Sequence, residues 1–133
     1  MAVSLTPREH ADLVSRLRAA GCVFAEDEAQ LLLLEARTRP ELAGMVERRV
    51  RGLPLQHILG WAELCGVRAA VEPGVFIPRR RTGFLVGQAS ALVRHGSVVV
   101  DLCCGSGAVG AALLAAESSI QLHAVDIDAA AAR

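Results

Sequence analysis

The stretch that decides the fold is Val98-Val99-Val100-Asp101-Leu102-Cys103-Cys104-Gly105-Ser106-Gly107-Ala108-Val109-Gly110. Its β-branched start is typical of a buried strand, and Gly105 and Gly107 predict a turn that lets the backbone approach a ligand closely. A helix is expected over 107–116, with its first N–H groups pointing into the turn. A second strand is expected over 120–126, and it ends at Asp126, 19 residues after Gly107. Strand, helix and strand in this order predict the beginning of a parallel α/β sheet.

The glycines also satisfy the pattern G-x-G-x-x-G, which is typical of dinucleotide sites. In that fingerprint the first glycine follows the strand directly, whereas Asp101-Leu102-Cys103-Cys104 intervenes here, and an acid at the strand tip would repel a pyrophosphate. S-adenosyl-L-methionine fits better, because it has no phosphate and carries an ammonium and a sulfonium that Asp101 can complement. The glycine loop and the helix N-terminus suit its carboxylate, and Asp126 suits its ribose.

Composition limits the classes of protein to consider. The chain has 133 residues, a formal net charge of +0 and 53% hydrophobic residues. The charge balance gives no reason to expect nucleic acid or an anionic membrane as partner. No apolar run is long enough for a membrane helix, and the N-terminus lacks the apolar segment of a secretory signal, so we expect a cytoplasmic protein. Four cysteines without C-x-x-C spacing predict reduced thiols and no metal site.

The first part of the chain carries signals for helices. Thr6-Pro7-Arg8-Glu9 predicts a capping box, and Gly21 predicts the end of that helix. Glu26-Asp27-Glu28 opens a second helix, in which we expect Leu31 to Leu34 to be buried. Pro40 starts a third helix that ends at Gly52, and a short helical piece is expected over 54–59. Residues 1–60 are therefore predicted to form a helical domain.

The signals change after Gly60. Residues 61–78 predict a β-hairpin linker, with two short extended pieces around Gly66 and a strand-like stretch at Val75-Phe76-Ile77. A helix is expected over 82–93, ahead of the strand, helix and strand described above. Residues 79–133 are therefore predicted to form the first part of an α/β domain.

Four segments carry a family resemblance. They are RRVRGLPLQHILG at 48–60, VEPGVFIPR at 71–79, DLCCGSGAVG at 101–110 and AVDID at 124–128. In the same order, they resemble motifs of the N5-glutamine methyltransferases that modify peptide-chain release factors, the PrmC/HemK-like family. The second segment followed by the third is far more specific than a general methyltransferase motif.

The resemblance implies a fold and an activity. The fold is α/β, with an N-terminal helical bundle followed by the start of a Rossmann-like class I methyltransferase domain whose parallel sheet is incomplete. The implied reaction moves a methyl group from S-adenosyl-L-methionine to the side-chain amide nitrogen of a glutamine in a release factor. The implied partner is thus a protein substrate, with no membrane, no direct nucleic-acid contact and no metal. The implied cofactor residues are Asp101, Cys103, Cys104, Gly105, Ser106, Gly107 and Asp126, and Phe76 and Arg79 would lie near the substrate.

The sequence departs from the family in two places. Arg79-Arg80-Arg81-Thr82-Gly83 follows Pro78 where the family has R-P-(D/E)-T-E, which indicates a divergent paralogous branch. The arginines are either a solvated helix entry or a contact to an anionic partner. The family's N-P-P-Y motif, whose asparagine positions the glutamine amide, is absent. We therefore expect no catalytic residue in 1–133 and an inactive N-terminal portion of the enzyme. The alternatives are a fragment of an NAD-dependent oxidoreductase and a non-catalytic module whose helices dock a partner.

Overall fold

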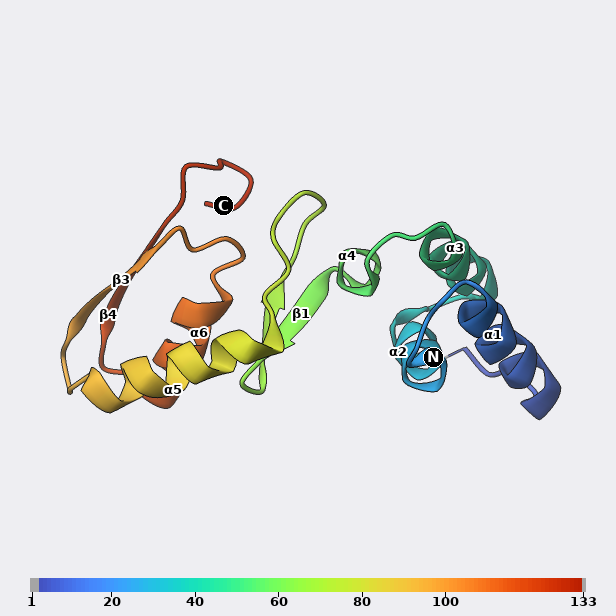
Figure 1. Ribbon diagram of the computed structural model, residues 1–133, viewed down its shortest axis with the longest axis horizontal. Helices are drawn as coiled ribbons and strands as arrows, with labels where there is room; N and C mark the ends of the chain where they lie inside the picture. The colour runs from blue at the N-terminus through green and yellow to red at the C-terminus, as the bar shows by residue number, and fades with distance from the viewer. Residues whose placement is uncertain (1–2, 133) are drawn as a thin grey trace. The chain divides into compact units, whose positions relative to one another are not determined.

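The computed structural model describes residues 3–132, and the chain divides into two compact units, residues 1–59 and 60–133. Among the described residues, the first unit contains helices α1 (Pro7–Ala19), α2 (Ala25–Glu35), α3 (Arg39–Val50) and α4 (Leu55–Leu59) (Figure 1). The predicted capping box of α1 is confirmed. Thr6 Oγ1 accepts a hydrogen bond from the Glu9 N–H at 3.3 Å, and Glu9 Oε2 accepts one from the Thr6 N–H at 2.7 Å.

The core of the first unit lies between α1, α2 and α3. Leu17, Ala25, Ala29 and Leu32 are completely buried in it. The prediction that Leu31 to Leu34 are all buried is confirmed only at Leu32, since Leu31 and Leu33 are half-buried and Leu34 is 66% exposed. With 3.6 residues per turn, position 34 lies almost opposite position 32 on the helix, so both cannot face the same core.

Arginine–carboxylate pairs join the helices of the first unit. Arg49 Nε lies 2.6 Å from Glu28 Oε2, with both side chains largely buried, and this pair joins α3 to α2. Arg39 Nη1 donates to Glu9 Oε1 at 2.7 Å and joins α3 to α1. Arg16, Arg18 and Arg51 also pair with glutamates. Five of the eight arginines of this unit are thus paired with glutamates within it.

The Glu9 pair predicts a pH dependence of stability. The Arg39 guanidinium and the Thr6 N–H lower the Glu9 pKa from 4.5 to about 2. A carboxyl whose pKa is lower in the folded than in the unfolded state stabilises the fold above the unfolded value, and this stabilisation is lost as the pH falls. We expect the midpoint of thermal unfolding, followed by far-UV circular dichroism, to decrease as the pH is lowered from about 4.5 to about 2. Arg39→Gln is expected to make this decrease smaller. Arg37→Gln is the matched control, and an equal flattening in that variant would contradict the assignment.

The second unit begins with a β-hairpin. Strands β1 (Trp61–Leu64) and β2 (Val67–Ala70) pair antiparallel, as predicted, with Leu64 opposite Val67. Cys65 and Gly66, the two turn residues, have positive φ angles of 52° and 77°, the conformation that two-residue hairpin turns require. Leu64 and Ala69 are buried in one core with residues of α5, α6 and β4. The hairpin, expected as a linker, is therefore packed into the second unit.

The segment after the hairpin is irregular. The predicted strand-like stretch Val75–Ile77 is not a strand, and no partner strand pairs with it within residues 3–132. Pro73 and Pro78 flank it and lack the N–H that a sheet ladder needs. Val75 is nevertheless buried, in a small cluster with Ala62 and Val71. A 3₁₀ turn (Arg80–Thr82) then leads into α5 (Gly83–Leu92).

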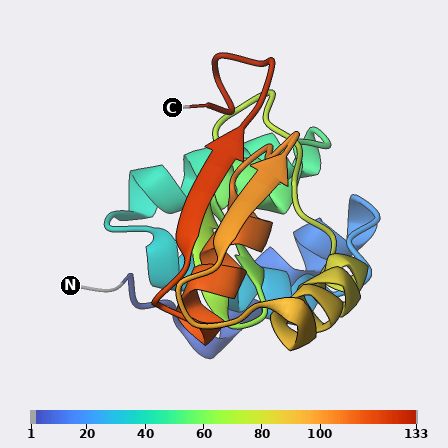
Figure 2. The ribbon, with the colours of Figure 1, turned by 90° about the vertical axis from the view of Figure 1, so that its left-hand side faces the viewer.

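The predicted strand, helix and strand are confirmed. They are β3 (Val98–Leu102), α6 (Ala108–Ala116) and β4 (Gln121–Val125), and the two strands pair parallel with Val98 beside Gln121 and Leu102 beside Val125. Figure 2 shows β3 and β4 side by side in front of α6. Parallel strands joined by a crossover helix bring both carboxyl ends to one edge of the sheet, where such folds bind ligands.

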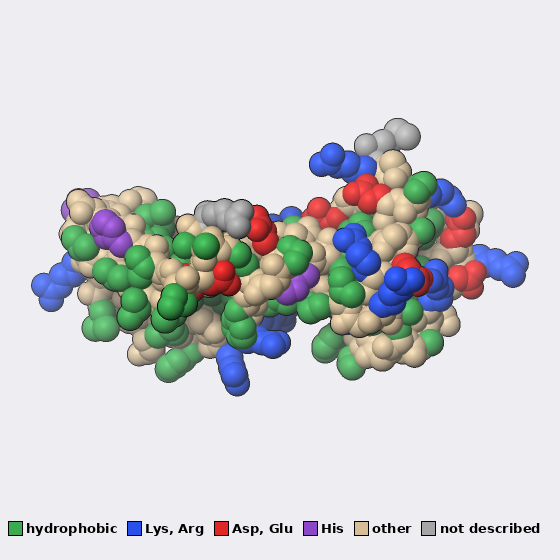
Figure 3. Space-filling model, turned by 90° about the horizontal axis from the view of Figure 1, so that it is seen from above, with side chains coloured by type: hydrophobic (Ala, Val, Ile, Leu, Met, Phe, Trp, Pro, Cys, Tyr) green, Lys and Arg blue, Asp and Glu red, His purple; other side chains and the backbone are tan. Residues whose placement is uncertain are grey.

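The two faces of this sheet differ. Val99 and Leu122 pack against the core that includes α6. Val98, Val100 and Leu102, which alternate with Val99 along β3, are 65%, 59% and 75% exposed. Many apolar side chains accordingly lie on the visible surface of the second unit (Figure 3). No helix within residues 3–132 combines the length and the apolar character that crossing a membrane would need.

Candidate functional site

The loop between β3 and α6 has an unusual backbone. Cys103, Gly105 and Gly107 all have positive φ angles, of 59°, 55° and 76°. Glycine adopts this conformation freely, whereas cysteine does so at a cost, so the surroundings hold the loop in this shape. The Cys104 N–H donates to Val125 O at 3.0 Å, and the Gly107 N–H donates to Cys104 O at 2.9 Å. The loop is thus tied both to β4 and to itself.

Asp126 follows β4 and lies against this loop. Its Oδ2 accepts a hydrogen bond from the Gly105 N–H at 2.8 Å, and its Oδ1 accepts one from the Asp128 N–H at 2.9 Å. The N–H groups of Asp128 and Gly105 lower the Asp126 pKa, so the side chain is ionised at neutral pH. A carboxylate has about four acceptor positions, and two further donors can therefore bind it.

Asp101 stabilises the start of α6. Its Oδ2 accepts a hydrogen bond from the Gly110 N–H at 3.1 Å, which satisfies one of the unpaired donors in the first turn of the helix. The sequence suggested a ligand role for Asp101 but not this contact, because the contact joins a strand to a helix nine residues later. One carboxylate oxygen remains for another partner.

A cavity of about 330 Å³ brings most of the predicted site residues together, and ligand cavities are commonly of this size. Its lining includes Asp101, Cys103 to Ser106, Asp126 and Phe76, all predicted from the sequence. Gly107 precedes the two α6 residues, Ala108 and Val109, that line the cavity. Lining residues that the sequence analysis did not select are Pro78, Thr82, Leu85, Leu102, Ala108 and Val109. The N-terminal, positive end of α6 therefore opens into a cavity that also holds two carboxylates.

Arg79 lies outside the lining of this cavity. Its guanidinium carbon is 5.8 Å from the centre of the Phe76 ring, and Phe76 itself lines the cavity. The cysteines of the loop are free thiols. Burial and the nearby Asp101 raise the pKa of Cys104, which keeps this thiol protonated. Among residues 3–132, no group of three or more histidine, cysteine or acidic side chains could hold a metal ion.

At Gly110, α6 lies close against the sheet. A Cβ atom at this position would lie 2.8 Å from Leu122 Cδ2 and 3.2 Å from Asp101 Oδ2. We expect Gly110→Ala to lower the free energy of unfolding by about 1 kcal/mol, because Leu122 and the capping Asp101 would have to move. Urea unfolding followed by the fluorescence of Trp61, the single tryptophan, measures this change.

Gly87 provides the matched control for this substitution. It lies inside α5, is exposed, and would have no atom within 4 Å of an added Cβ. Gly87→Ala is expected to raise the free energy of unfolding by up to about 1 kcal/mol, because alanine favours helix. If both substitutions stabilise the chain equally, the close approach at Gly110 has no energetic importance.

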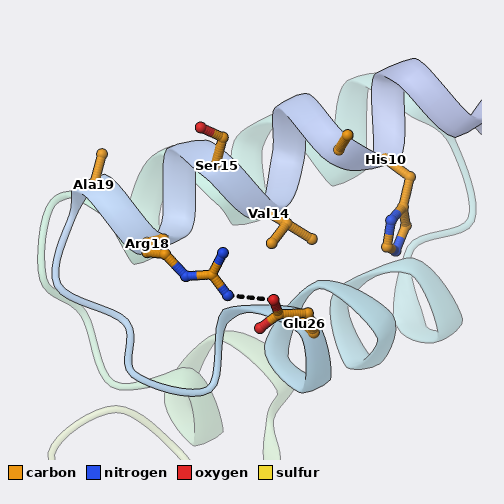
Figure 4. Close-up of a pocket in the computed structure, with 7 residues that line it drawn as sticks. His10, Val14, Ser15, Arg18, Ala19 and Glu26 are labelled. Atoms are coloured by element: carbon orange, nitrogen blue, oxygen red, sulfur yellow. Dashed lines mark hydrogen bonds and ion pairs between the residues drawn. The ribbon is translucent and has the colours of Figure 1, made fainter.

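A second, larger cavity lies on the helical unit. It measures about 580 Å³ and is lined by residues of α1 and by Glu26 of α2. Figure 4 shows that Arg18 and Glu26 form an ion pair across it, with His10 at its other end. Among the lining residues that the structure describes, the arginine and the glutamate thus neutralise each other.

Comparisons with known proteins identify the family. The family model described as Methyltransferase small domain matches residues 71–133, which include the loop, Asp126 and Phe76. Curated release factor glutamine methyltransferases are also similar. The Bifidobacterium longum protein is 37% identical over 85% of this chain, and the Mycolicibacterium smegmatis protein is 34% identical over 95%. The chain belongs to the release factor glutamine methyltransferase (PrmC/HemK-like) family.

Membership fits the observed α/β fold of the second unit. A third relative, from Corynebacterium glutamicum, is 47% identical over 68% of this chain. The chain spans 47% of the Bifidobacterium protein, 44% of the Mycolicibacterium protein and 33% of the Corynebacterium protein. The similarity therefore covers most of this chain but less than half of each of these relatives.

Proposed function

We propose that the cavity beside the β3–α6 loop binds S-adenosylmethionine, and that this chain supplies the cofactor-binding part of a methyltransferase. In this proposal, the methyl group goes to the side-chain amide nitrogen of a glutamine in a peptide-chain release factor. The names of the relatives support this substrate.

The charge of the cavity lining is the observation that carries the cofactor assignment. Two carboxylates, Asp101 and Asp126, line it, and none of its described lining residues is an arginine, lysine or histidine. A dinucleotide would bring a doubly charged pyrophosphate next to these carboxylates. S-adenosylmethionine instead carries two positive groups, a sulfonium and an ammonium, and a single carboxylate of its own. Its net charge is therefore positive. Coulomb attraction thus favours the sulfonium nucleoside over NAD.

The residues of the site suit each part of this cofactor. Asp126 has acceptor positions for the ribose hydroxyls beyond its bonds to Gly105 and Asp128. The N-terminal end of α6 suits the methionine carboxylate, and the second oxygen of Asp101 suits the ammonium group. When bound, the cofactor supplies an electrophilic methyl group on its sulfonium.

Methyl transfer to an amide needs a group that positions the nitrogen, since an amide nitrogen is a weak nucleophile. An asparagine side chain could hold the amide, but the sequence contains no asparagine. We expect residues 1–133 alone to bind the cofactor and not to transfer the methyl group. Incubation of the chain with a purified release factor and radiolabelled S-adenosylmethionine tests this, and label in the release factor would contradict it.

Isothermal titration calorimetry of the 133-residue chain tests the cofactor assignment. We expect S-adenosylmethionine and S-adenosylhomocysteine to bind, and NAD to bind at least about a hundredfold more weakly. Tighter binding of NAD would instead support the oxidoreductase alternative. Absence of binding by either nucleoside, in a chain whose Trp61 fluorescence shows a cooperative unfolding transition, would refute the proposed site.

A further inference from the structure

The arginines between Pro78 and Thr82 are three consecutive residues without an ion-pair partner among residues 3–132. In the first unit, Arg16, Arg18, Arg39, Arg49 and Arg51 all pair with glutamates. Arg79, Arg80 and Arg81 are exposed, and none of them forms an ion pair with a carboxylate of residues 3–132. Figure 3 shows basic side chains projecting from the second unit into solvent. Three adjacent guanidinium groups are thus available to an external anion.

Their position in the fold is electrostatically unfavourable. The arginines precede α5, and no acidic residue lies in the first turn of that helix. Positive side chains at a helix N-terminus are opposed by the helix dipole, and they also repel one another. A bound anion would relieve both effects, so this arrangement is better suited to a complex than to the free chain.

Apolar side chains flank the arginines and complete a surface of the kind found at protein interfaces. Phe76 is 67% exposed and Phe84 is 75% exposed, and the Arg79 guanidinium lies 5.8 Å from the centre of the Phe76 ring. Arginine and aromatic residues contribute most of the binding energy in many protein interfaces. We name this surface, Arg79–Arg81 with Phe76 and Phe84, the arginine patch.

The arginine patch adjoins the cavity assigned to the cofactor. Phe76, Pro78, Thr82 and Leu85 line that cavity, and the arginines lie between them in the chain. A polypeptide whose side chain reaches the methyl group of the bound cofactor would therefore pass over the patch within a few residues. We infer that the arginine patch binds an acidic segment of the protein substrate, next to the residue that is methylated. This inference rests on the proposed function.

A protein partner fits these observations better than nucleic acid does. Guanidinium groups pair with carboxylates through two parallel hydrogen bonds, so a few acidic residues can engage all three arginines. Nucleic-acid binding draws on a large excess of positive charge, whereas this chain has a net charge of +0. An RNA ligand is therefore an outcome that the experiment must distinguish.

The test compares two synthetic peptides that share a central glutamine. One carries three glutamates next to it, and the other carries three serines at the same positions. Calorimetry with the 133-residue chain saturated with S-adenosylhomocysteine is expected to show about tenfold tighter binding of the acidic peptide, since exposed ion pairs contribute only modestly. Double substitution Arg80→Gln, Arg81→Gln is expected to abolish this preference, because it removes charge without removing an internal contact.

Arg94→Gln is the matched control. Arg94 is an exposed arginine of the same unit that follows α5 and does not line the cavity. The inference is overturned if the peptides bind equally, if neither binds at millimolar concentration, or if Arg94→Gln abolishes the preference as well. It is also overturned if a ten-nucleotide single-stranded RNA binds more tightly than the acidic peptide. The same peptide titrations without nucleoside distinguish failure of this inference from failure of the proposed function. The patch can prefer the acidic peptide even if S-adenosylhomocysteine does not bind.

Discussion

Asp126→Ala is expected to weaken the binding of S-adenosylhomocysteine about a hundredfold in calorimetric titrations. A hydrogen bond from a ribose hydroxyl to a carboxylate contributes at least about 1.5 kcal/mol, and the loss of both bonds at this lower limit corresponds to about a hundredfold. The substitution also removes the acceptor that holds the Gly105 N–H at 2.8 Å, so only the bond from the Cys104 N–H to Val125 O still ties the loop to the end of β4. Because backbone N–H groups lower the Asp126 pKa, the affinity should not vary with ionisation of this carboxyl between about pH 5 and about pH 8.

Asp128→Ala controls for the loss of a nearby acidic residue. The Asp128 carboxylate accepts a hydrogen bond from the Ala130 N–H and does not line the cavity. Its backbone N–H, which donates to Asp126, is retained in alanine. We expect the affinity of this variant to stay within about twofold of the unsubstituted chain. Unchanged affinity in Asp126→Ala would show that the ribose is not held here.

The sequence predicts the local elements of this protein well where a cap or a turn determines them. Thr6 and Glu9 predict the start of α1, and Gly66 predicts the hairpin turn. The β-branched run before Asp101 and the glycines after it predict β3, the loop and α6. In each case, neighbouring residues supply both the hydrogen bonds and the conformational preference, so no distant contact is needed for the prediction.

Features that depend on contacts between residues far apart in the sequence were harder to predict. Val75–Ile77 has the composition of a strand, but a strand needs a partner, and composition does not reveal one. Leu34 is apolar but lies opposite the buried face of α2. At the site, the spacing of Gly107 and Asp126 suggested that loop and acid would meet, whereas the cavity positions of Thr82 and Leu85 follow from the packing of α5.

Asp101 has two expected functions that a pair of substitutions can separate. It caps α6 through the Gly110 N–H, and it contributes a negative charge to the cavity. Asparagine keeps a side-chain oxygen that can accept from Gly110, whereas alanine does not. We expect Asp101→Asn to weaken S-adenosylhomocysteine binding about tenfold through the lost charge, and to leave the Trp61 unfolding midpoint nearly unchanged.

Asp101→Ala is expected to weaken binding about a hundredfold and to lower the free energy of unfolding by about 1–2 kcal/mol, because it removes both the cap and the charge. The difference in S-adenosylhomocysteine affinity between the two variants measures how much the position of α6 contributes to binding. If both variants lose the same stability, the 3.1 Å contact with Gly110 does not act as a cap. If asparagine binds the nucleoside as tightly as aspartate, the charge of Asp101 does not contribute to holding the ammonium group, and Asp126 alone accounts for the preference of the cavity for a cation.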